Sequence, residues 1–503
     1  MSLLDRDRTV APPGYRRWLI PPAALAVHLS IGQVYAFSVF KEPLVEHFDT
    51  KLTPISVIFS IAIVMLGLSA AFGGTWVERN GPRKAMFASG CFWSLGFVVA
   101  AIGVASDQLW LVYLGYGVLG GIGLGLGYIS PVSTLIKWFP DRPGLATGLA
   151  IMGFGGGALI ASPLSDALLG FYADSPADAI APAFLTLGAI YFVVMMMGAF
   201  TVRVPADDWQ PAGWSPDKQK REQLVTTGDV TAANAIRTPQ FWLLWTVLFC
   251  NVTAGIGILE QAAPMVQDHF DTVSAAAAAG FVGLLSLCNM SGRFVWSSTS
   301  DVVGRKPIYM LYLGAGAVLY FLLAATGTAS LAWFVLLTGI ILSFYGGGFA
   351  TVPAYLKDLF GTLEVGAIHG RLLTAWSAAG VAGPLIVNAI ADAQTEAGKS
   401  GADLYTLSMY IMVGVLGVGF PGQPDDPAGE RASHGAVRGG DGALLSQGRA
   451  RAPRGHREEL TMESETSERG AELRGYVLWV IVGAGLLYGV VNTARQVADL
   501  FGV

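Results

Sequence analysis

Arg293 combines a residue type and a place in the chain that suggest anion binding. It lies in the apolar run 275–298, where a charged side chain costs at least a few kcal/mol and normally faces a cavity or a partner. A guanidinium can hold a carboxylate through two parallel hydrogen bonds, so we expect Arg293 to bind a carboxylate group. In the alternative interpretation, Arg293 extends to the membrane surface or pairs with an acid such as Asp301, about two helical turns away.

Five uncharged residues in other apolar runs are candidates for the same site: Gln33, Tyr35, Tyr128, Tyr345 and Trp376. Gln33 and Tyr35 are two residues apart, which places them about 200° apart around a helix. One of them is therefore expected to face a cavity while the other packs. For the remaining three, the alternative is ordinary packing among membrane helices.

Two titratable residues are candidate proton carriers, Glu260 near the end of one apolar run and His369 near the start of another. Their alternative is a place at the membrane surface. The sequence has no metal-ligand cluster, nucleophile motif or phosphate-binding loop. We therefore expect no catalytic residue, no metal, no cofactor and no nucleic-acid partner, and an enzyme is the weaker interpretation.

Two short charged segments repeat one pattern, an acid followed three residues later by a glycine and shortly afterwards by a basic pair. The repeated positions are Glu78, Gly81, Arg83, Asp301, Gly304 and Arg305, and Arg79 follows the first acid directly. A pattern that recurs in both halves of a membrane chain indicates an internal duplication, and in such chains the substrate lies between the halves. We expect these residues to form a cytoplasmic gate, whose charge pairs form in one conformation and break in another.

The composition agrees with a membrane protein. Hydrophobic residues make up 53% of the chain and charged residues 13%, whereas a soluble domain carries roughly 25% charged residues. A bilayer-spanning helix needs about 20 apolar residues. The candidate runs are 18–40, 54–77, 84–105, 109–136, 144–166, 181–202, 240–263, 275–298, 307–326, 330–352, 369–392 and 404–420.

Lys and Arg lie mainly in the loops on the side of the N-terminus, and before residue 420 the opposite loops hold Lys41, Lys51 and Lys399. This bias predicts a cytoplasmic N-terminus. The sequence thus predicts an all-α, multi-pass protein of a cell (inner) membrane. Its expected parts are a cytoplasmic segment 1–17, a six-helix bundle 18–202, a cytoplasmic loop 203–238 and a second six-helix bundle 239–420 whose last helix is short.

The repeated charged pattern resembles the signature of the major facilitator superfamily between helices two and three and between helices eight and nine. Longer strings are similar to the oxalate/formate antiporter family. They are GLGYISP at 125–131, KWFPDRPGLATG at 137–148, GGGF at 346–349, PAYL at 353–356, DLFG at 358–361 and GAIHGR at 366–371. The resemblance implies a twelve-helix fold that transports small organic anions by alternating access.

The resemblance also implies which residues hold the anion. Oxalate exchangers of this family use an Arg in helix eight and a Lys in helix eleven; Arg293 matches the first, and Trp376 stands at the position of the second. With one cation, a monocarboxylate such as formate, lactate or pyruvate is expected. Oxalate/formate exchange and a transporter-like sensor of carboxylates are the alternatives, and antiport and proton symport are both open.

The chain changes character after Phe420. Residues 421–461 are rich in Pro, Gly, Arg and Ala without periodicity, and we expect a disordered linker, extending to residue 475, that looks like an out-of-frame reading. Residues 462–503 resemble a one-helix companion subunit of such transporters, here fused, with an additional transmembrane helix at 476–494. A frameshift that joins two reading frames and a genuine linker are the two alternatives.

Overall fold

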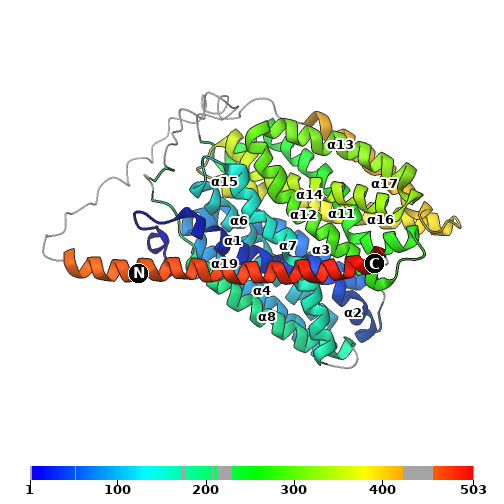
Figure 1. Ribbon diagram of the computed structural model, residues 1–503, viewed down its shortest axis with the longest axis horizontal. Helices are drawn as coiled ribbons and strands as arrows, with labels where there is room; N and C mark the ends of the chain where they lie inside the picture. The colour runs from blue at the N-terminus through cyan, green and yellow to red at the C-terminus, as the bar shows by residue number, and fades with distance from the viewer. Residues whose placement is uncertain are drawn as a thin grey trace.

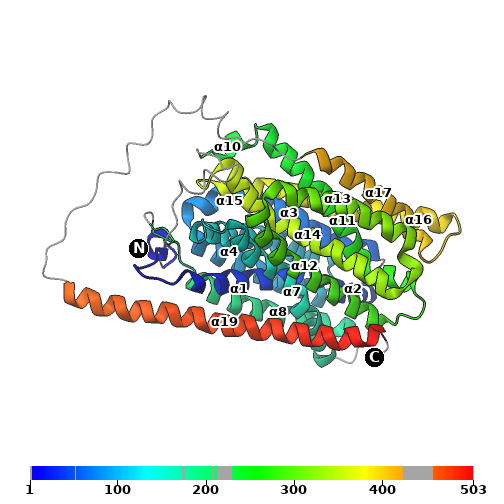
Figure 2. The ribbon, with the colours of Figure 1, turned by 45° about the horizontal axis from the view of Figure 1, so that its top comes forward.

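A computed structural model describes residues 3–50, 52–172, 176–206, 209–211, 229–422 and 457–501. In these ranges the regular structure is helical, and Val10 and Val204 form an isolated parallel bridge. The elements make two bundles, which lie side by side in Figures 1 and 2.

The N-terminal bundle is preceded by the short helices η1 (Arg6–Thr9) and η2 (Arg17–Leu19). Its elements are α1 (Pro21–Ile31), η3 (Gly32–Phe40), α2 (Lys41–His47), α3 (Leu52–Asn80), α4 (Pro82–Ala105), α5 (Leu109–Val112), η4 (Tyr113–Gly120), α6 (Gly121–Trp138), α7 (Pro143–Tyr172) and α8 (Pro176–Thr201). Two of the spans are irregular, because η3 continues α1 as a 3₁₀-helix and η4 is a π-helical stretch before α6. Such stretches inside a longer helix are frequent at hinges and functional sites.

The C-terminal bundle follows the described part of the predicted central loop. Its elements are α10 (Ala232–Ala235), α11 (Pro239–His269), α12 (Ala275–Val303), α13 (Arg305–Thr326), η5 (Gly327–Ala329), α14 (Leu331–Phe360), α15 (Val365–Leu372), α16 (Thr374–Glu396), α17 (Asp403–Gly419) and η6 (Phe420–Gly422). The helix α17 has 17 residues.

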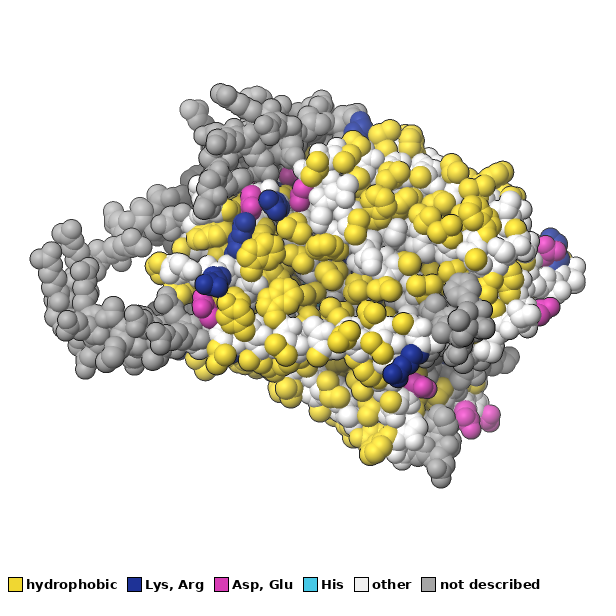
Figure 3. All heavy atoms as spheres, viewed as in Figure 1, with side chains coloured by type: hydrophobic (Ala, Val, Ile, Leu, Met, Phe, Trp, Pro, Cys, Tyr) yellow, Lys and Arg dark blue, Asp and Glu magenta, His cyan; other side chains and the backbone are white. Residues whose placement is uncertain are grey.

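Among the described residues, eleven helices are long and apolar enough to cross a membrane, and α17 is a shorter apolar helix. Hydrophobic side chains cover the middle of the face seen in Figure 3, and the charged ones gather mostly toward its ends. The predicted all-α membrane architecture is therefore confirmed.

The two charged motifs make the same turn. Gly81 joins α3 to α4 with a φ of 85°, and Gly304 joins α12 to α13 with a φ of 98°. Residues with a Cβ avoid this left-handed region, so glycine permits one long helix to end and the next to begin within a single residue. We call the end of the molecule that holds both turns the motif end.

The bundles meet along two pairs of contacts. The helix α7 packs against α12 and α14, and α3 packs against α15 and α16. Glycines bring the backbones close at both seams, since a Cβ on Gly74 would lie 2.7 Å from Cα of Ala367 and a Cβ on Gly155 would lie 2.9 Å from Nε of Arg293. Small residues at such seams allow the close packing that drives helix association in lipid.

A further helix, α19 (Arg457–Phe501), runs along the outside of the molecule (Figures 1 and 2) and contacts α1, α7, α8 and α12. Trp479 Nε1 donates a hydrogen bond to the Trp18 carbonyl at 3.0 Å. The helix begins well before residue 476, so the prediction of a disordered linker is wrong for residues 457–475. Glu, Leu, Met and Arg favour a helix there. Residues 423–456, where the rest of that prediction falls, lie outside the described part of the chain.

Candidate functional site

Arg293 lies between the two bundles and is fully buried, with 0% of its surface exposed. Its Nε donates to Oδ1 of Asn289 at 2.9 Å, and its Nη1 donates to the carbonyl of Ile151 on α7 at 3.2 Å. Both acceptors are neutral, and Nη2 is buried without a hydrogen-bond partner. Among the described residues, no Asp or Glu pairs with this guanidinium.

The sequence alternative in which Arg293 pairs with Asp301 is not what the structure shows. Asp301 is paired instead with Arg305, with 2.7 Å between Oδ1 and Nη2. The Arg293 guanidinium is therefore held by a backbone and an amide oxygen, with the hydroxyls of Tyr35 and Tyr128 close to it.

Aromatic rings enclose the guanidinium from both bundles. Its carbon Cζ lies 5.7 Å from the ring centre of Phe154 on α7 and 5.2 Å from that of Phe349 on α14. These distances are within the range of cation–π attraction. Phe154 and Phe349 are not among the residues that the sequence singles out, although each stands next to a run of glycines.

Four sequence candidates lie in the same enclosure. Trp376 on α16 packs 4.6 Å from Phe349, and Tyr128 on α6 lies 5.4 Å from Trp376, both between ring centres. Tyr35 and Tyr345, from opposite bundles, join their hydroxyls at 3.2 Å. We call Arg293 and these six rings the aromatic enclosure: Tyr35, Tyr128, Phe154, Tyr345, Phe349 and Trp376.

The aromatic enclosure holds several hydrogen-bonding groups without partners. Tyr128 hydroxyl and Trp376 Nε1 are buried and unsatisfied, like Nη2 of Arg293. Leaving such a group unpaired costs about 1–3 kcal/mol, and more when it is charged. The arrangement therefore supplies one positive charge and several hydrogen-bond donors. A carboxylate would neutralise the charge and accept hydrogen bonds from the donors.

Gln33, the remaining candidate, lies elsewhere. Its Oε1 accepts a hydrogen bond from the hydroxyl of Tyr116 at 2.9 Å, inside the N-terminal bundle. The 3₁₀ geometry of η3 changes the angle between Gln33 and Tyr35, but the two still face different surroundings.

The two proton-carrier candidates differ in what the structure describes. His369 on α15 is buried, both its ring nitrogens lack partners, and its ring centre lies 5.8 Å from that of Tyr128. It is therefore adjacent to the aromatic enclosure, three residues after the motif-end contact of Gly366. The side chain of Glu260 lies outside the described residues.

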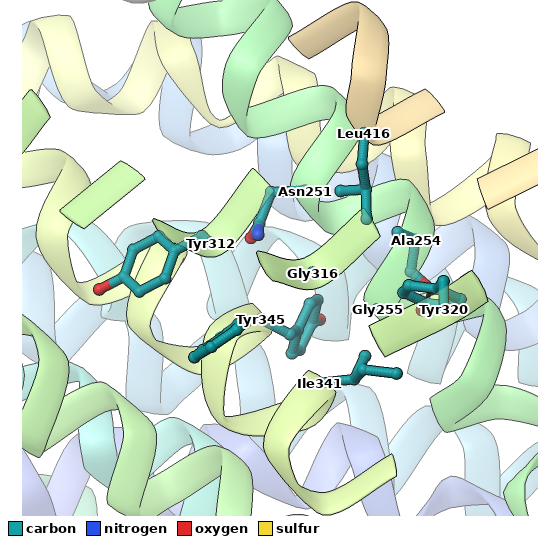
Figure 4. A pocket seen from close by; sticks show the side chains of 10 residues that line it. Asn251, Ala254, Gly255, Tyr312, Gly316, Tyr320, Ile341, Tyr345 and Leu416 are labelled. Atoms are coloured by element: carbon teal, nitrogen blue, oxygen red, sulfur yellow. Dashed lines mark hydrogen bonds between the residues drawn. The ribbon is translucent and has the colours of Figure 1, made fainter. Parts of the chain in front are cut away.

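A small cavity borders the aromatic enclosure inside the C-terminal bundle (Figure 4). It is lined by Asn251, Gly255, Tyr312, Tyr345 and other residues, and its volume is ≈ 10 Å³. This is about the room that one water molecule needs. The cavity is too small for a carboxylate, so we do not assign it as the substrate site.

At the motif end, the acid of each repeat contacts the opposite bundle. Oδ1 and Oδ2 of Asp301 accept hydrogen bonds from the backbone nitrogens of Gly144 and Leu145 at 2.8 and 2.9 Å. These nitrogens lie at the start of α7, where the helix dipole favours a negative charge. Arg305 holds Asp301 and also donates from Nε to Oδ2 of Asp358 at 3.0 Å.

The first repeat makes the equivalent contact. Oε1 of Glu78 accepts from the backbone nitrogen of Gly366 at 3.1 Å, at the start of α15, and Oε2 accepts from Nζ of Lys137 at 2.8 Å. The other two basic candidates are not in this contact, because Arg79 is exposed and Arg83 donates to the carbonyls of Leu3 and Val202. The bundles are therefore joined at the motif end in this structure.

Comparison with known proteins agrees with this architecture. The family model of the Major Facilitator Superfamily matches residues 23–384. The chain is 26% identical to the oxalate:formate antiporter of Oxalobacter formigenes over 382 residues, which are 75% of this chain and 85% of the relative. It is 27% identical to the apicoplast pyruvate carrier 1 of Toxoplasma gondii over 355 residues, which are 60% of this chain and 63% of the relative.

Among solved structures, the chain is similar to the fucose:proton symporter of Escherichia coli. The TM-score is 0.59 at 14% identity, and the match covers 82% of this chain and 100% of the symporter. At this identity the similarity shows the fold alone.

Proposed function

The chain belongs to the major facilitator superfamily, and from this premise we propose that it carries small organic anions, preferably monocarboxylates, across a membrane by alternating access. The single observation that carries the proposal is the set of hydrogen-bond partners that the buried Arg293 has and lacks. A buried guanidinium with neutral partners and one free nitrogen is costly inside a membrane protein. A bound carboxylate would neutralise the charge and accept the free hydrogen bonds.

The preference for one carboxylate group follows from the number of cations. Arg293 is the positive charge of the aromatic enclosure, and Trp376 fills the place at which relatives that exchange oxalate are expected to have Lys. Burying a second negative charge without a partner would cost several kcal/mol, which corresponds to a factor of about a thousand or more in affinity. The similarity to a pyruvate carrier points the same way.

Oxalate/formate exchange is the second candidate, and the similarity to the oxalate:formate antiporter favours it. The two are distinguished by competition. Oxalate, formate, lactate and pyruvate would be compared at equal concentration as competitors of labelled substrate in proteoliposomes. A monocarboxylate should compete best; if oxalate competes best, another group supplies the second charge and the preference is wrong.

The contacts at the motif end suggest the direction of opening. Glu78 must leave the backbone of Gly366, and Asp301 must leave the start of α7, before the bundles can separate at this end. The distribution of Lys and Arg supports a cytoplasmic motif end. Labelling of a cysteine at Arg237 from outside intact cells would contradict this orientation.

The test of the site is substitution of Arg293. Arg293→Ala should abolish uptake of labelled carboxylate into proteoliposomes, and Arg293→Lys should retain part of it, because the charge remains and the paired hydrogen bonds do not. Arg237→Ala removes an exposed arginine and serves as the matched control. Thermal unfolding of each purified variant identifies loss of folding. Normal uptake by folded Arg293→Ala would show that the anion binds elsewhere.

A further inference from the structure

A groove runs along the outer surface between α8 and α19. Its volume is ≈ 500 Å³, and its walls include Phe192, Met196 and Phe200 on α8 with Leu473 and Val477 on α19. These side chains expose almost exclusively apolar surface to the groove. Such a surface inside a membrane span suits a hydrocarbon chain.

One end of this groove is basic. Arg474 belongs to its lining, is exposed, and stands near the start of the apolar span Glu472–Arg495 of α19. Arg83 is the second residue of α4 and Arg203 lies two residues after the end of α8. Arg474 is at the same end, because the adjacent Gly475 lies against Leu19, so all three arginines lie where apolar spans begin or end.

Arg83 lies beside Arg203, because its Nη2 donates to the carbonyl of Val202, the preceding residue, at 3.4 Å. Burial lowers the pKa of Arg203; Tyr15 opposes this shift and the positive charge of Arg474 adds to it.

These guanidinium groups also have unused donors. Nε of Arg83 and Nη1 of Arg203 are buried without hydrogen-bond partners. The other nitrogens of Arg83 donate to backbone carbonyls, and Nε of Arg474 donates to the carbonyl of Gly470 at 3.1 Å. Among the described residues, none of the three arginines pairs with an Asp or Glu. Burial raises the pKa of the Tyr15 hydroxyl, and the nearby negative charge of Glu472 adds to this shift.

We propose that the groove between α8 and α19 binds an anionic phospholipid, with an acyl chain against Phe192, Met196 and Phe200 and the phosphate at Arg474, Arg83 and Arg203. Guanidinium groups bind phosphate oxygens through paired hydrogen bonds. Basic pockets between transmembrane helices at the membrane surface are suited to acidic headgroups. The apolar groove and the unpaired arginines are each explained by one amphiphilic ligand.

The occupant also has a place in the packing of α19. This helix contacts the N-terminal bundle at Trp18 and at Leu19, where Gly475 lies against the Leu19 side chain. Between that contact and α8, the groove remains open. A lipid there would complete the contact between α19 and the N-terminal bundle.

The experiment measures lipid binding by the intact chain, purified in detergent. Phosphatidylglycerol and phosphatidylcholine would be titrated separately, and bound lipid counted by native mass spectrometry. Phosphatidylglycerol should bind more tightly. Arg474→Gln should weaken its binding about fivefold, since one basic residue near an acidic lipid contributes about 1 kcal/mol, while Arg495→Gln, at the other end of the same span, should leave binding unchanged.

A second variant tests the apolar walls of the groove. A second ligand, inorganic phosphate, tests whether the site binds a lipid headgroup or a free anion. Met196→Trp narrows the groove and should weaken binding of phosphatidylglycerol, without requiring any change at the arginines. Inorganic phosphate should not displace the lipid. Equal binding of the two lipids, full binding by Arg474→Gln, or displacement by inorganic phosphate at matched concentration would each overturn the proposal, the last by showing a site for a free anion.

Discussion

At the scale of single residues, two neutral oxygen atoms orient the guanidinium group of Arg293. Asn289 and Ile151 accept two of its donors, which fixes the guanidinium without cancelling its charge. An acid in either place would neutralise the cation and remove the reason for an anion to bind. The site therefore depends on the neutral oxygens that Arg293 contacts and equally on its having no acidic partner among the described residues.

We predict that Trp376 determines whether the site prefers anions with one or with two negative charges. Trp376→Lys should shift competition toward dicarboxylates such as oxalate, because it adds a second cation to the aromatic enclosure. Trp376→Phe keeps an aromatic ring but removes the indole donor and part of the side-chain volume, so it should weaken binding of a monocarboxylate at least about tenfold, the effect of losing one hydrogen bond to a charged group. Competition assays on both variants measure the two effects. An unchanged preference in a folded Trp376→Lys variant would contradict this role.

His369 is predicted to carry a coupling proton. It is buried beside Tyr128, and neither of its ring nitrogens has a hydrogen-bond partner, so it is placed to take up a proton when the bundles separate and water reaches it. His369→Gln should abolish uptake driven by a pH gradient while exchange of internal for external substrate continues. His47→Gln is the matched control, since His47 already bonds the Val104 carbonyl. Loss of both activities, or of neither, would argue against a coupling role.

The sequence identifies much of the aromatic enclosure because charge, donor groups and position within apolar runs are visible in it. It brings forward Arg293, Tyr35, Tyr128, Tyr345 and Trp376, which the structure places together. Phe154 and Phe349 escape notice because a Phe in an apolar helix carries no chemical signal of its own. Which of Gln33 and Tyr35 faces the enclosure depends on tertiary packing, which helical spacing alone does not decide.

At the scale of elements, the repeated glycines are predicted to be structural requirements. Gly304→Ala should lower thermal stability, because a residue with a Cβ is strained by about 1–3 kcal/mol at the φ of 98° and ψ of 156° found here. A Cβ there would meet its nearest atom, Cδ of Pro307, at 3.5 Å, so the cost is conformational and crowding is not its source. Melting of the purified variant, compared with that of Gly414→Ala on α17, where a Cβ meets nothing within 4 Å, measures it. Equal melting temperatures would contradict the requirement.

Most spanning helices are predictable from apolar runs bounded by Gly, Pro and charged residues. Their internal irregularities are not, because the 3₁₀ stretch η3 and the π stretch η4 follow from packing between helices. The start of α19 is also not evident from the sequence. Its polar, Glu- and Arg-rich segment is typical of a linker by composition, although its residues favour a helix once an adjoining transmembrane helix provides a nucleus.

At the scale of the whole molecule, the inter-bundle contacts describe one of the two states that alternating access requires. Arg293 and five of the six rings of the aromatic enclosure are buried, Tyr35 is half-buried, and Glu78 and Asp301 join the bundles at the motif end. Each acid accepts hydrogen bonds from a helix start in the other bundle, so the duplicated motif produces two related latches. Their release would open the same end of the molecule.

A disulfide across the motif end should stop transport. A Cβ on Gly366 of α15 would lie 3.0 Å from Cβ of Ser133 on α6, so a small shift brings paired cysteines to the ≈ 3.8 Å of a disulfide. In a chain with Cys91, Cys250 and Cys288 replaced by Ser, oxidation of the S133C/G366C variant should reduce uptake to background, and reduction should restore it, because the bundles must separate here in each cycle. The S133C/G366A variant adds the same crowding without a second thiol and should be insensitive to oxidation. Continued transport by the oxidised protein, with the disulfide verified by mass spectrometry, would show that the motif end does not open.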